Sequence, residues 1–126
     1  MIIIGRSYIS PELEERWKVE ENHIAEFVIW KMLHSRRRKP WSLDDMMDAY
    51  EEHLESLGVS RAKRRHINFG FNSKRTFQTA IFVLRDKSYI KEDSGYHYTY
   101  FLTEAGRATA RKIESIPKVP ESILKY

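Results

Sequence analysis

The chain has 126 residues, 41% of them hydrophobic, which suits a single domain with a hydrophobic core. It contains no cysteine, and this excludes disulfides, thiolate zinc sites and cysteine nucleophiles. No apolar run approaches the ~18 residues that a membrane-spanning helix needs, and the apolar opening from Met1 to Gly5 is too short for a signal peptide. We therefore expect a cytoplasmic protein without a membrane partner.

The formal net charge is +4, and the positive charge is concentrated in two parts of the chain. Residues 27–43 contain five Lys or Arg and residues 56–85 contain seven, and neither segment contains an acidic residue. The rest of the chain is net acidic. Such separation creates a local positive field, which favours a polyanionic partner, although solvated basic loops are the alternative interpretation.

The first predicted element is a long helix. Ser10-Pro11-Glu12 is a typical helix start, and apolar residues then recur at roughly helical spacing. This pattern predicts a helix from Pro11 to about Ser35, either continuous or broken near Glu21-Asn22. Residues 24–33 are apolar nearly all round, so we expect them at the centre of the core.

A second helix is predicted between Ser42, which can cap it, and Gly58, which can end it. Its apolar residues form one stripe, made of Leu43, Met46, Met47, Tyr50, Leu54 and Leu57. The opposite face is predicted to be acidic and solvated, with Asp48, Glu51, Glu52 and Glu55.

A basic connection follows, in which residues 60–67 fit a short helix. The next predicted helix is capped by Asn72 or Ser73 and runs to about Lys87. At 100° per residue, its core face consists of Phe77, Ala80, Ile81 and Leu84. Its outer face consists of Lys74, Arg75, Gln78, Thr79, Phe82 and Arg85.

Two aromatic, β-prone runs come next, residues 89–93 and 96–102, and Asp93-Ser94-Gly95 predicts the turn of a hairpin between them. Thr103 then caps a last predicted helix from Glu104 to about Ile116, with Ala105, Ala108 and Ile113 as its apolar residues. Pro117 and Pro120 are predicted to end it.

This order of elements predicts an α+β, mainly helical fold with three core helices and a two-stranded hairpin over residues 22–116. Two segments, Leu84-Arg-Asp-Lys-Ser-Tyr-Ile90 and Tyr100-Phe-Leu-Thr-Glu-Ala-Gly-Arg107, resemble MarR- and PadR-like winged-helix regulators. Those families show Leu-x-x-x-Gly-hydrophobic-Ile and then Tyr-x-Leu-Thr-x-x-Gly-Arg. Here Ser88-Tyr89 replaces the glycine and an aliphatic residue.

The resemblance implies a winged helix-turn-helix protein that binds double-stranded DNA sequence-specifically as a transcriptional regulator. It also implies a homodimer, with dimer contacts from terminal elements outside the DNA-reading core, Met1 to Trp17 and Lys112 to Tyr126. The N-terminal arm and helix are then residues 1–21, the winged-helix domain is residues 22–116, and the tail is residues 117–126. The recognition helix is either 73–87 or 60–68. We prefer 73–87 in the major groove because the hairpin follows it directly, and we assign the hairpin tip, 91–97, as the wing.

The expected DNA contacts follow from this assignment. Arginine and glutamine side chains can read guanine and adenine in the major groove, whereas other basic residues contact phosphates. The predicted DNA-binding residues are Arg61, Lys63, Arg64, Arg65, Ser73, Lys74, Arg75, Gln78, Thr79, Arg85, Lys91 and His97. Phe82 packs under the basic connection, touches a thymine methyl group or belongs to a subunit interface.

Two other classes of function, an enzyme and an interaction module, are alternatives to DNA binding. The five histidines are scattered, and no nucleophile elbow, phosphate loop or metal-spaced carboxylate cluster occurs, so we expect no enzyme, no cofactor and no metal site. The second alternative is a winged-helix protein-interaction or RNA-binding module within a larger assembly, whose basic surface would face an acidic partner.

Overall fold

The structure is a computed structural model, and it describes residues 11–35, 39–58, 73–93 and 98–120. Within these ranges the fold is α+β and mainly helical, with four helices and a three-stranded antiparallel sheet. The elements in chain order are α1 (Pro11–His34), β1 (Trp41–Ser42), α2 (Leu43–Ser56), α4 (Ser73–Asp86), β2 (Ile90–Glu92), β3 (Thr99–Leu102) and α5 (Glu104–Arg111). The predicted helix 60–67 lies outside the described residues.

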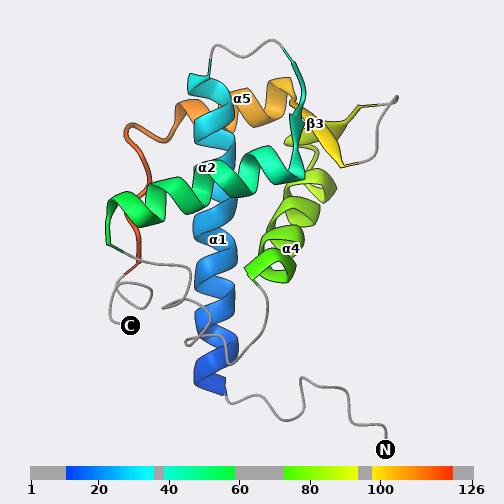
Figure 1. Cartoon of the computed structure of the whole chain (residues 1–126). Helices are drawn as coiled ribbons and strands as arrows, with labels where there is room; N and C mark the ends of the chain where they lie inside the picture. Colours follow the sequence, from blue (N-terminus) through cyan, green and yellow to red (C-terminus); the bar gives the residue numbers. More distant parts are fainter. Residues whose placement is uncertain (1–10, 36–38, 59–72, 94–97, 121–126) are drawn as a thin grey trace, which may run out of the picture.

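Helix α1 is the axis of the molecule, and the other helices pack around it (Figure 1). It runs unbroken for 24 residues, so the break considered near Glu21-Asn22 does not occur. Its second half buries Ile24, Phe27 and Val28 at 2% exposure or less, as its apolar sequence predicted.

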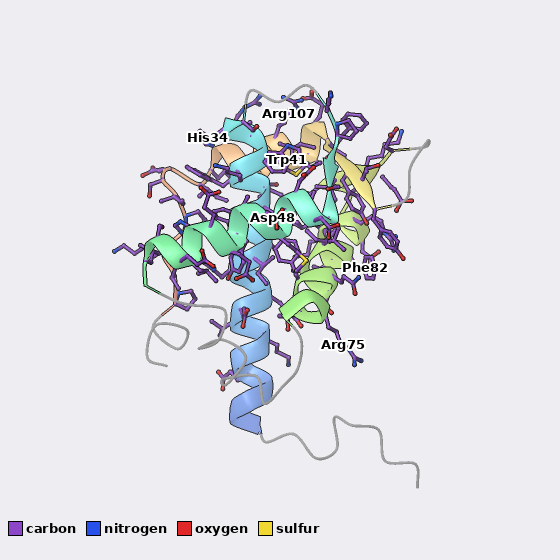
Figure 2. The ribbon with its side chains drawn as sticks, viewed as in Figure 1. His34, Trp41, Asp48, Arg75, Phe82 and Arg107 are labelled. Atoms are coloured by element: carbon purple, nitrogen blue, oxygen red, sulfur yellow. The ribbon has the colours of Figure 1, made fainter. Side chains whose placement is uncertain are left out.

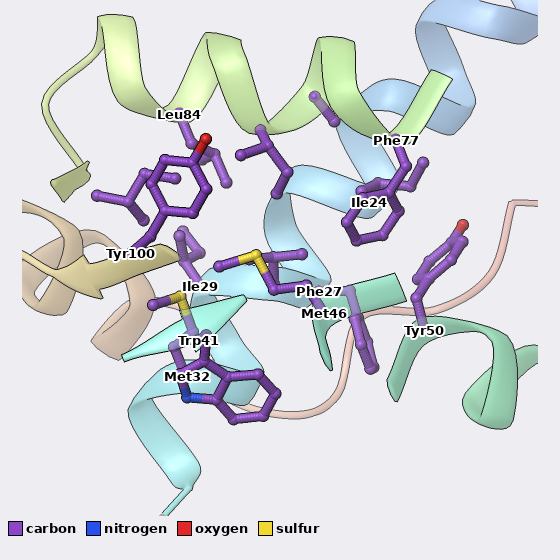
Figure 3. Packing of buried hydrophobic residues seen from close by; sticks show 14 of the residues in the cluster. Ile24, Phe27, Ile29, Met32, Trp41, Met46, Tyr50, Phe77, Leu84 and Tyr100 are labelled. Atoms are coloured by element: carbon purple, nitrogen blue, oxygen red, sulfur yellow. The ribbon is translucent and has the colours of Figure 1, made fainter. Parts of the chain in front are cut away.

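The core lies where α1, α2, α4 and the sheet meet (Figure 3). Rings make up much of it. The Tyr50 ring of α2 lies 5.4 Å from the Phe27 ring of α1 and 5.8 Å from the Phe77 ring of α4. Such tilted and edge-on ring pairs add about 1 kcal/mol beyond the area they bury. The three helices are therefore held together through one aromatic residue.

Helix α2 begins and ends as the sequence predicted. The Ser42 hydroxyl accepts a hydrogen bond from the Asp45 amide at 3.0 Å, and the Asp45 carboxylate accepts one from the Ser42 amide at 3.2 Å. This reciprocal capping box satisfies two backbone amides at the first turn. At the other end Gly58 adopts a φ of +83°, which costs glycine little.

The sheet has three strands, not the two that were predicted. The additional strand, β1, places Trp41 opposite Tyr100 and Ser42 opposite Thr99, which gives the order β1-β3-β2. Two residues are too short to show an alternating pattern in the sequence. Their pairing depends on β3, which lies far away along the chain.

The chain passes from α4 into β2 through a tight turn at Ser88. Ser88 has a φ of +62°, and the Tyr89 amide donates to the Leu84 carbonyl at 3.0 Å. The Ser88 amide donates to the Arg85 carbonyl at 2.9 Å, which completes a Schellman helix end. Ser88 therefore occupies a left-handed position at the end of α4, a position that glycine adopts at the least cost.

Helix α5 is shorter than predicted, because it ends at Arg111 and not near Ile116. Its buried residues are Gly106 and Ala110, whereas Ala105 and Ala108 are exposed. The chain turns after α5 and returns to α1, where Val119 joins the core. This return also brings the Pro117 carbonyl within 3.4 Å of the buried His23 Nε2 atom.

Candidate nucleic-acid interface

Helix α4 has one buried side and one exposed side. Phe77, Ala80, Ile81 and Leu84 are all at 3% exposure or less, which confirms the predicted core face. Figure 2 shows Arg75 and Phe82 on the other side of α4, directed away from α1 and α2. The exposed side of this helix is therefore accessible to a large partner.

The described polar residues on the exposed side differ in what they can contact. Arg75 and Thr79 are exposed, and Gln78 is half-buried. The Thr79 hydroxyl donates to the Arg75 carbonyl at 3.0 Å. Its proton is thus used within the helix, and the Thr79 oxygen remains an acceptor for an outside donor.

Phe82 forms a small cluster with the last turn of α4. It is 36% exposed, and the Arg85 guanidinium lies over its ring at 5.0 Å from the centroid. Arg85 also lies 4.0 Å from the Asp86 carboxylate. Both groups of this ion pair are largely in solvent, so the pair is weak, and Arg85 can exchange it for another anion.

The hairpin places one predicted residue, Lys91, on the exposed surface of β2. The remaining predicted residues cannot be placed. Arg61, Lys63, Arg64, Arg65 and His97 lie outside the described residues, as does the alternative recognition segment 60–68. Ser73 and Lys74 belong to the first turn of α4, but their side chains are also outside the described part.

The acidic face of α2 is confirmed for Asp48, Glu52 and Glu55, which are exposed. Figure 2 shows Asp48 on α2, apart from Arg75 on α4. The prediction was wrong for Glu51, which is buried at 5% exposure. Glu51 lies one turn after Met47, so it sits at the edge of the buried stripe and is covered there.

Two surface hollows of similar volume are formed by the described residues beside the core. One, of about 310 Å³, lies between α1, α4 and α5, and it is lined by Glu21, Glu26 and Lys87 together with apolar residues. The other, of about 320 Å³, lies where α1, the sheet and α5 meet. Its lining residues are Met32, Lys39, Trp41, Tyr100, Phe101, Leu102 and Arg107.

Sequence reasoning missed Phe101 and Arg107 as surface residues of interest. Phe101 is 45% exposed, because alternation along β3 buries Tyr100 and turns the next side chain outward. Arg107 belongs to the segment that resembles the regulators, and the sequence analysis predicts no binding role for it. The period-2 pattern Tyr100-Phe101-Leu102 was a usable signal for the outward ring.

Among the described residues, partly buried His53 and fully buried Tyr100 have shifted pKa values. Burial lowers the pKa of His53, and the nearby Lys31 charge lowers it further. Burial raises the pKa of the Tyr100 phenol, and Glu92 raises it further, so this hydroxyl stays neutral. Neither the His53 Nε2 atom nor the Tyr100 hydroxyl has a hydrogen-bond partner within the described part of the chain.

The described ranges bring together no group of three His, Asp or Glu side chains that fits a metal ion. In the same part of the chain, no helix has both the length and the apolar character needed to cross a bilayer. No family model, no curated protein and no solved structure matches the chain.

Proposed function

We propose that the chain is a winged helix-turn-helix protein that binds double-stranded DNA sequence-specifically as a homodimeric transcriptional regulator. In this proposal α4 lies in the major groove and the β2–β3 hairpin is the wing. The observation that carries it is the position of α4, which buries one side against α1 and presents Arg75 and Thr79 on the other.

The arrangement of the sheet supports this proposal. The hairpin starts directly after α4, and β1, between α1 and α2, pairs with β3. The two segments that resemble the regulators, residues 84–90 and 100–107, connect α4 to β2 and β3 to α5. Thr103, which caps α5, donates from its hydroxyl to the Ser88 carbonyl at 2.6 Å. The end of α4 and the base of the hairpin are thus held in one orientation, as a pair of DNA-contacting elements requires.

The chemistry of the α4 surface fits the major groove. An arginine such as Arg75 can donate two hydrogen bonds to guanine O6 and N7, and Gln78 can pair with adenine N6 and N7. Lys91 on the hairpin suits a phosphate contact, which adds affinity and salt dependence but no sequence preference. The acids of α2 lie on another face, so they do not oppose such an approach.

Selection of bound sequences from a random duplex pool tests the proposal. A palindromic consensus is the expected result, because two-fold symmetry of a dimer is matched by two half-sites. Sedimentation that shows only monomer at micromolar concentration would argue against the homodimer. A pool without any enriched sequence would overturn sequence-specific binding.

A matched pair of variants tests the role of α4. Arg75→Ala removes one exposed charge from the proposed interface, and Arg111→Ala removes one from the last turn of α5. We expect Arg75→Ala to weaken binding to the selected duplex by about 1–3 kcal/mol, whereas Arg111→Ala leaves it nearly unchanged. Equal losses would mean that only net charge matters and would contradict the assignment of α4.

The exposed Phe82 supports a second candidate, a winged-helix interaction module within a larger assembly. An aromatic ring beside Arg85 and Asp86 is a typical protein-contact group. Failure to bind any duplex at about 50 mM salt favours this module, since phosphate contacts strengthen steeply as salt falls.

A further inference from the structure

The hollow of about 320 Å³ between α1, the sheet and α5 combines cations with an exposed ring. Lys39 and Arg107 are both exposed on its lining, and Phe101 is 45% exposed. Figure 2 shows Arg107 and Trp41 at this end of the molecule, apart from Arg75 on α4. No acidic residue lines this hollow within the described part of the chain.

The cationic surface continues across the sheet. Lys91 on β2 is the direct partner of Phe101 on β3, so the two side chains are neighbours on the outer face. Within the described ranges, no carboxylate lies within 4 Å of Lys39, Lys91 or Arg107 as an ion-pair partner. An anion that enters here therefore displaces no carboxylate of the described ranges.

We propose that this hollow binds an unpaired nucleotide, with its base stacked on Phe101 and its phosphate held between Lys39 and Arg107. Aromatic rings in a positively charged groove are the usual means of holding unpaired bases, because every base has a flat face that can stack. Lys91 then lies beside the ring, where it can contact the next phosphate along a strand.

The hollow between α1, α4 and α5 lacks the chemistry that a phosphate requires. It has nearly the same volume, but Glu21 and Glu26 line it and would repel a phosphate. An intact duplex does not satisfy the proposed site either, since its base faces are stacked on one another. The site is therefore distinct from the proposed duplex contact on α4.

The first measurement uses the full chain and a labelled single-stranded oligonucleotide of about ten nucleotides. This length lies within the usual site size of domains that bind single strands. Fluorescence anisotropy is measured at low salt, in parallel with an abasic strand of the same length. We expect the strand with bases to bind about tenfold more tightly, because the abasic strand keeps the phosphates and loses the stacking. Equal binding of the two strands would overturn the stacking role, and no binding of either would overturn the site.

Variants of the ring test the assignment to Phe101. Phe101→Leu keeps an apolar, β-compatible side chain and removes the ring, so we expect a loss of about tenfold in single-strand affinity. Phe101→Tyr keeps the ring and is expected to bind like the unaltered protein. If Phe101→Leu also binds normally, the ring has no role and the proposal fails.

Variants of the cations provide a second test that does not depend on the fold of β3. Arg107→Ala removes a cation from the hollow, and Arg111→Ala removes one further along α5. We expect Arg107→Ala to reduce the salt slope by about one phosphate contact, and Arg111→Ala to leave it unchanged. Equal slopes for the two variants would contradict the phosphate contact.

Competition identifies the source of the nucleotide. If a nucleoside monophosphate displaces the labelled strand from the unaltered protein but not from Phe101→Leu, the site takes free nucleotides. If only a longer strand displaces it, the site takes a nucleotide within a single strand. Displacement by inorganic phosphate at the same concentration as the nucleotide would show that the base contributes nothing and would overturn the proposal.

Discussion

Helices α2 and α4 each have 14 residues, and each buries one side against α1 and the sheet. Their solvent-exposed sides, however, differ in charge. The exposed side of α2 carries Asp48, Glu52 and Glu55, whereas that of α4 carries Arg75, Thr79 and Phe82. The buried sides follow from apolar spacing and are similar. The two helices therefore differ in the charge of their exposed sides, although their buried sides are alike.

The two helices also end differently. The turn after α2 contains Gly58, around which an added Cβ atom would meet nothing within 4 Å. The turn after α4 leads to Tyr89, and Gly106 of α5 lies so close to this residue that an added Cβ atom would collide with its carbonyl. The backbone that follows α4 is therefore packed against α5 at Tyr89, although the side chains of residues 85–88 are exposed. Four measurements test this difference between the two helices.

The largest effect is expected at Gly106. A methyl group there would overlap the Tyr89 carbonyl oxygen, so α5 must move away from the turn that follows α4. We expect Gly106→Ala to lower the free energy of unfolding by about 3 kcal/mol, measured by urea unfolding. Gly58→Ala is the control, and it should cost about 1 kcal/mol from its positive φ alone. Equal costs would show that both ends are equally open.

The buried tyrosines next to the two helices are expected to respond in opposite ways. The Tyr50 hydroxyl of α2 forms a hydrogen bond with the buried His23 Nδ1 atom at 2.8 Å. Tyr100 points from β3 toward α4 (Figure 3), and its buried hydroxyl has no hydrogen-bond partner among the described residues. We expect Tyr50→Phe to cost about 1–2 kcal/mol and Tyr100→Phe to cost nothing or to stabilise.

Thermal unfolding of Tyr50→Phe and Tyr100→Phe measures both changes in stability. A clear loss of stability for Tyr100→Phe would mean that its hydroxyl has a partner in the folded protein. A neutral Tyr50→Phe would mean that the hydrogen bond to His23 is replaced by water.

A smaller effect of opposite sign is expected at Ser88. Its φ of +62° strains any residue with a Cβ atom, and glycine relieves this strain at some cost in chain entropy. We expect Ser88→Gly to raise the free energy of unfolding by about 0.5–1 kcal/mol, measured by chemical denaturation. Ser88→Ala keeps the strain and is expected to give no gain, so a similar gain in both variants would contradict this explanation.

The smallest effect is a pH dependence that belongs to α2 alone. The pKa of His53 is lowered by burial and by Lys31, whereas the buried side of α4 carries no titratable group. The unfolded chain therefore takes up a proton before the folded protein does. Stability should be complete above the unfolded pKa of about 6.5 and should fall as the pH decreases below it.

His53→Gln is expected to flatten this part of the curve of unfolding free energy against pH. An unchanged slope between a pH of about 5.5 and about 6.5 would show that His53 is not the group responsible.

Much of this arrangement was predictable from local patterns. The core face of α4 and the capping box of α2 depend on residues three or four positions apart, and a helix places such residues together in any context. Alternation in residues 99–102 likewise contains the outward position of Phe101. These features need no knowledge of the rest of the chain.

Features that depend on distant partners were not predictable in this way. Strand β1 exists because Trp41 pairs with Tyr100, and Glu51 is buried because other elements cover the edge of its helix. The early end of α5 at Arg111 lets Val119 reach the core. Each of these outcomes depends on which surfaces meet.

The amino-acid sequence by itself determined the helices, their apolar sides and the separation of basic from acidic segments, because spacing and charge are local properties. The tertiary structure alone decided that Lys39, Phe101 and Arg107, from three separate parts of the chain, line one hollow, and that α4 and α2 turn their opposite charges to different faces. The physical reason is that burial and proximity are set by packing between segments far apart along the chain.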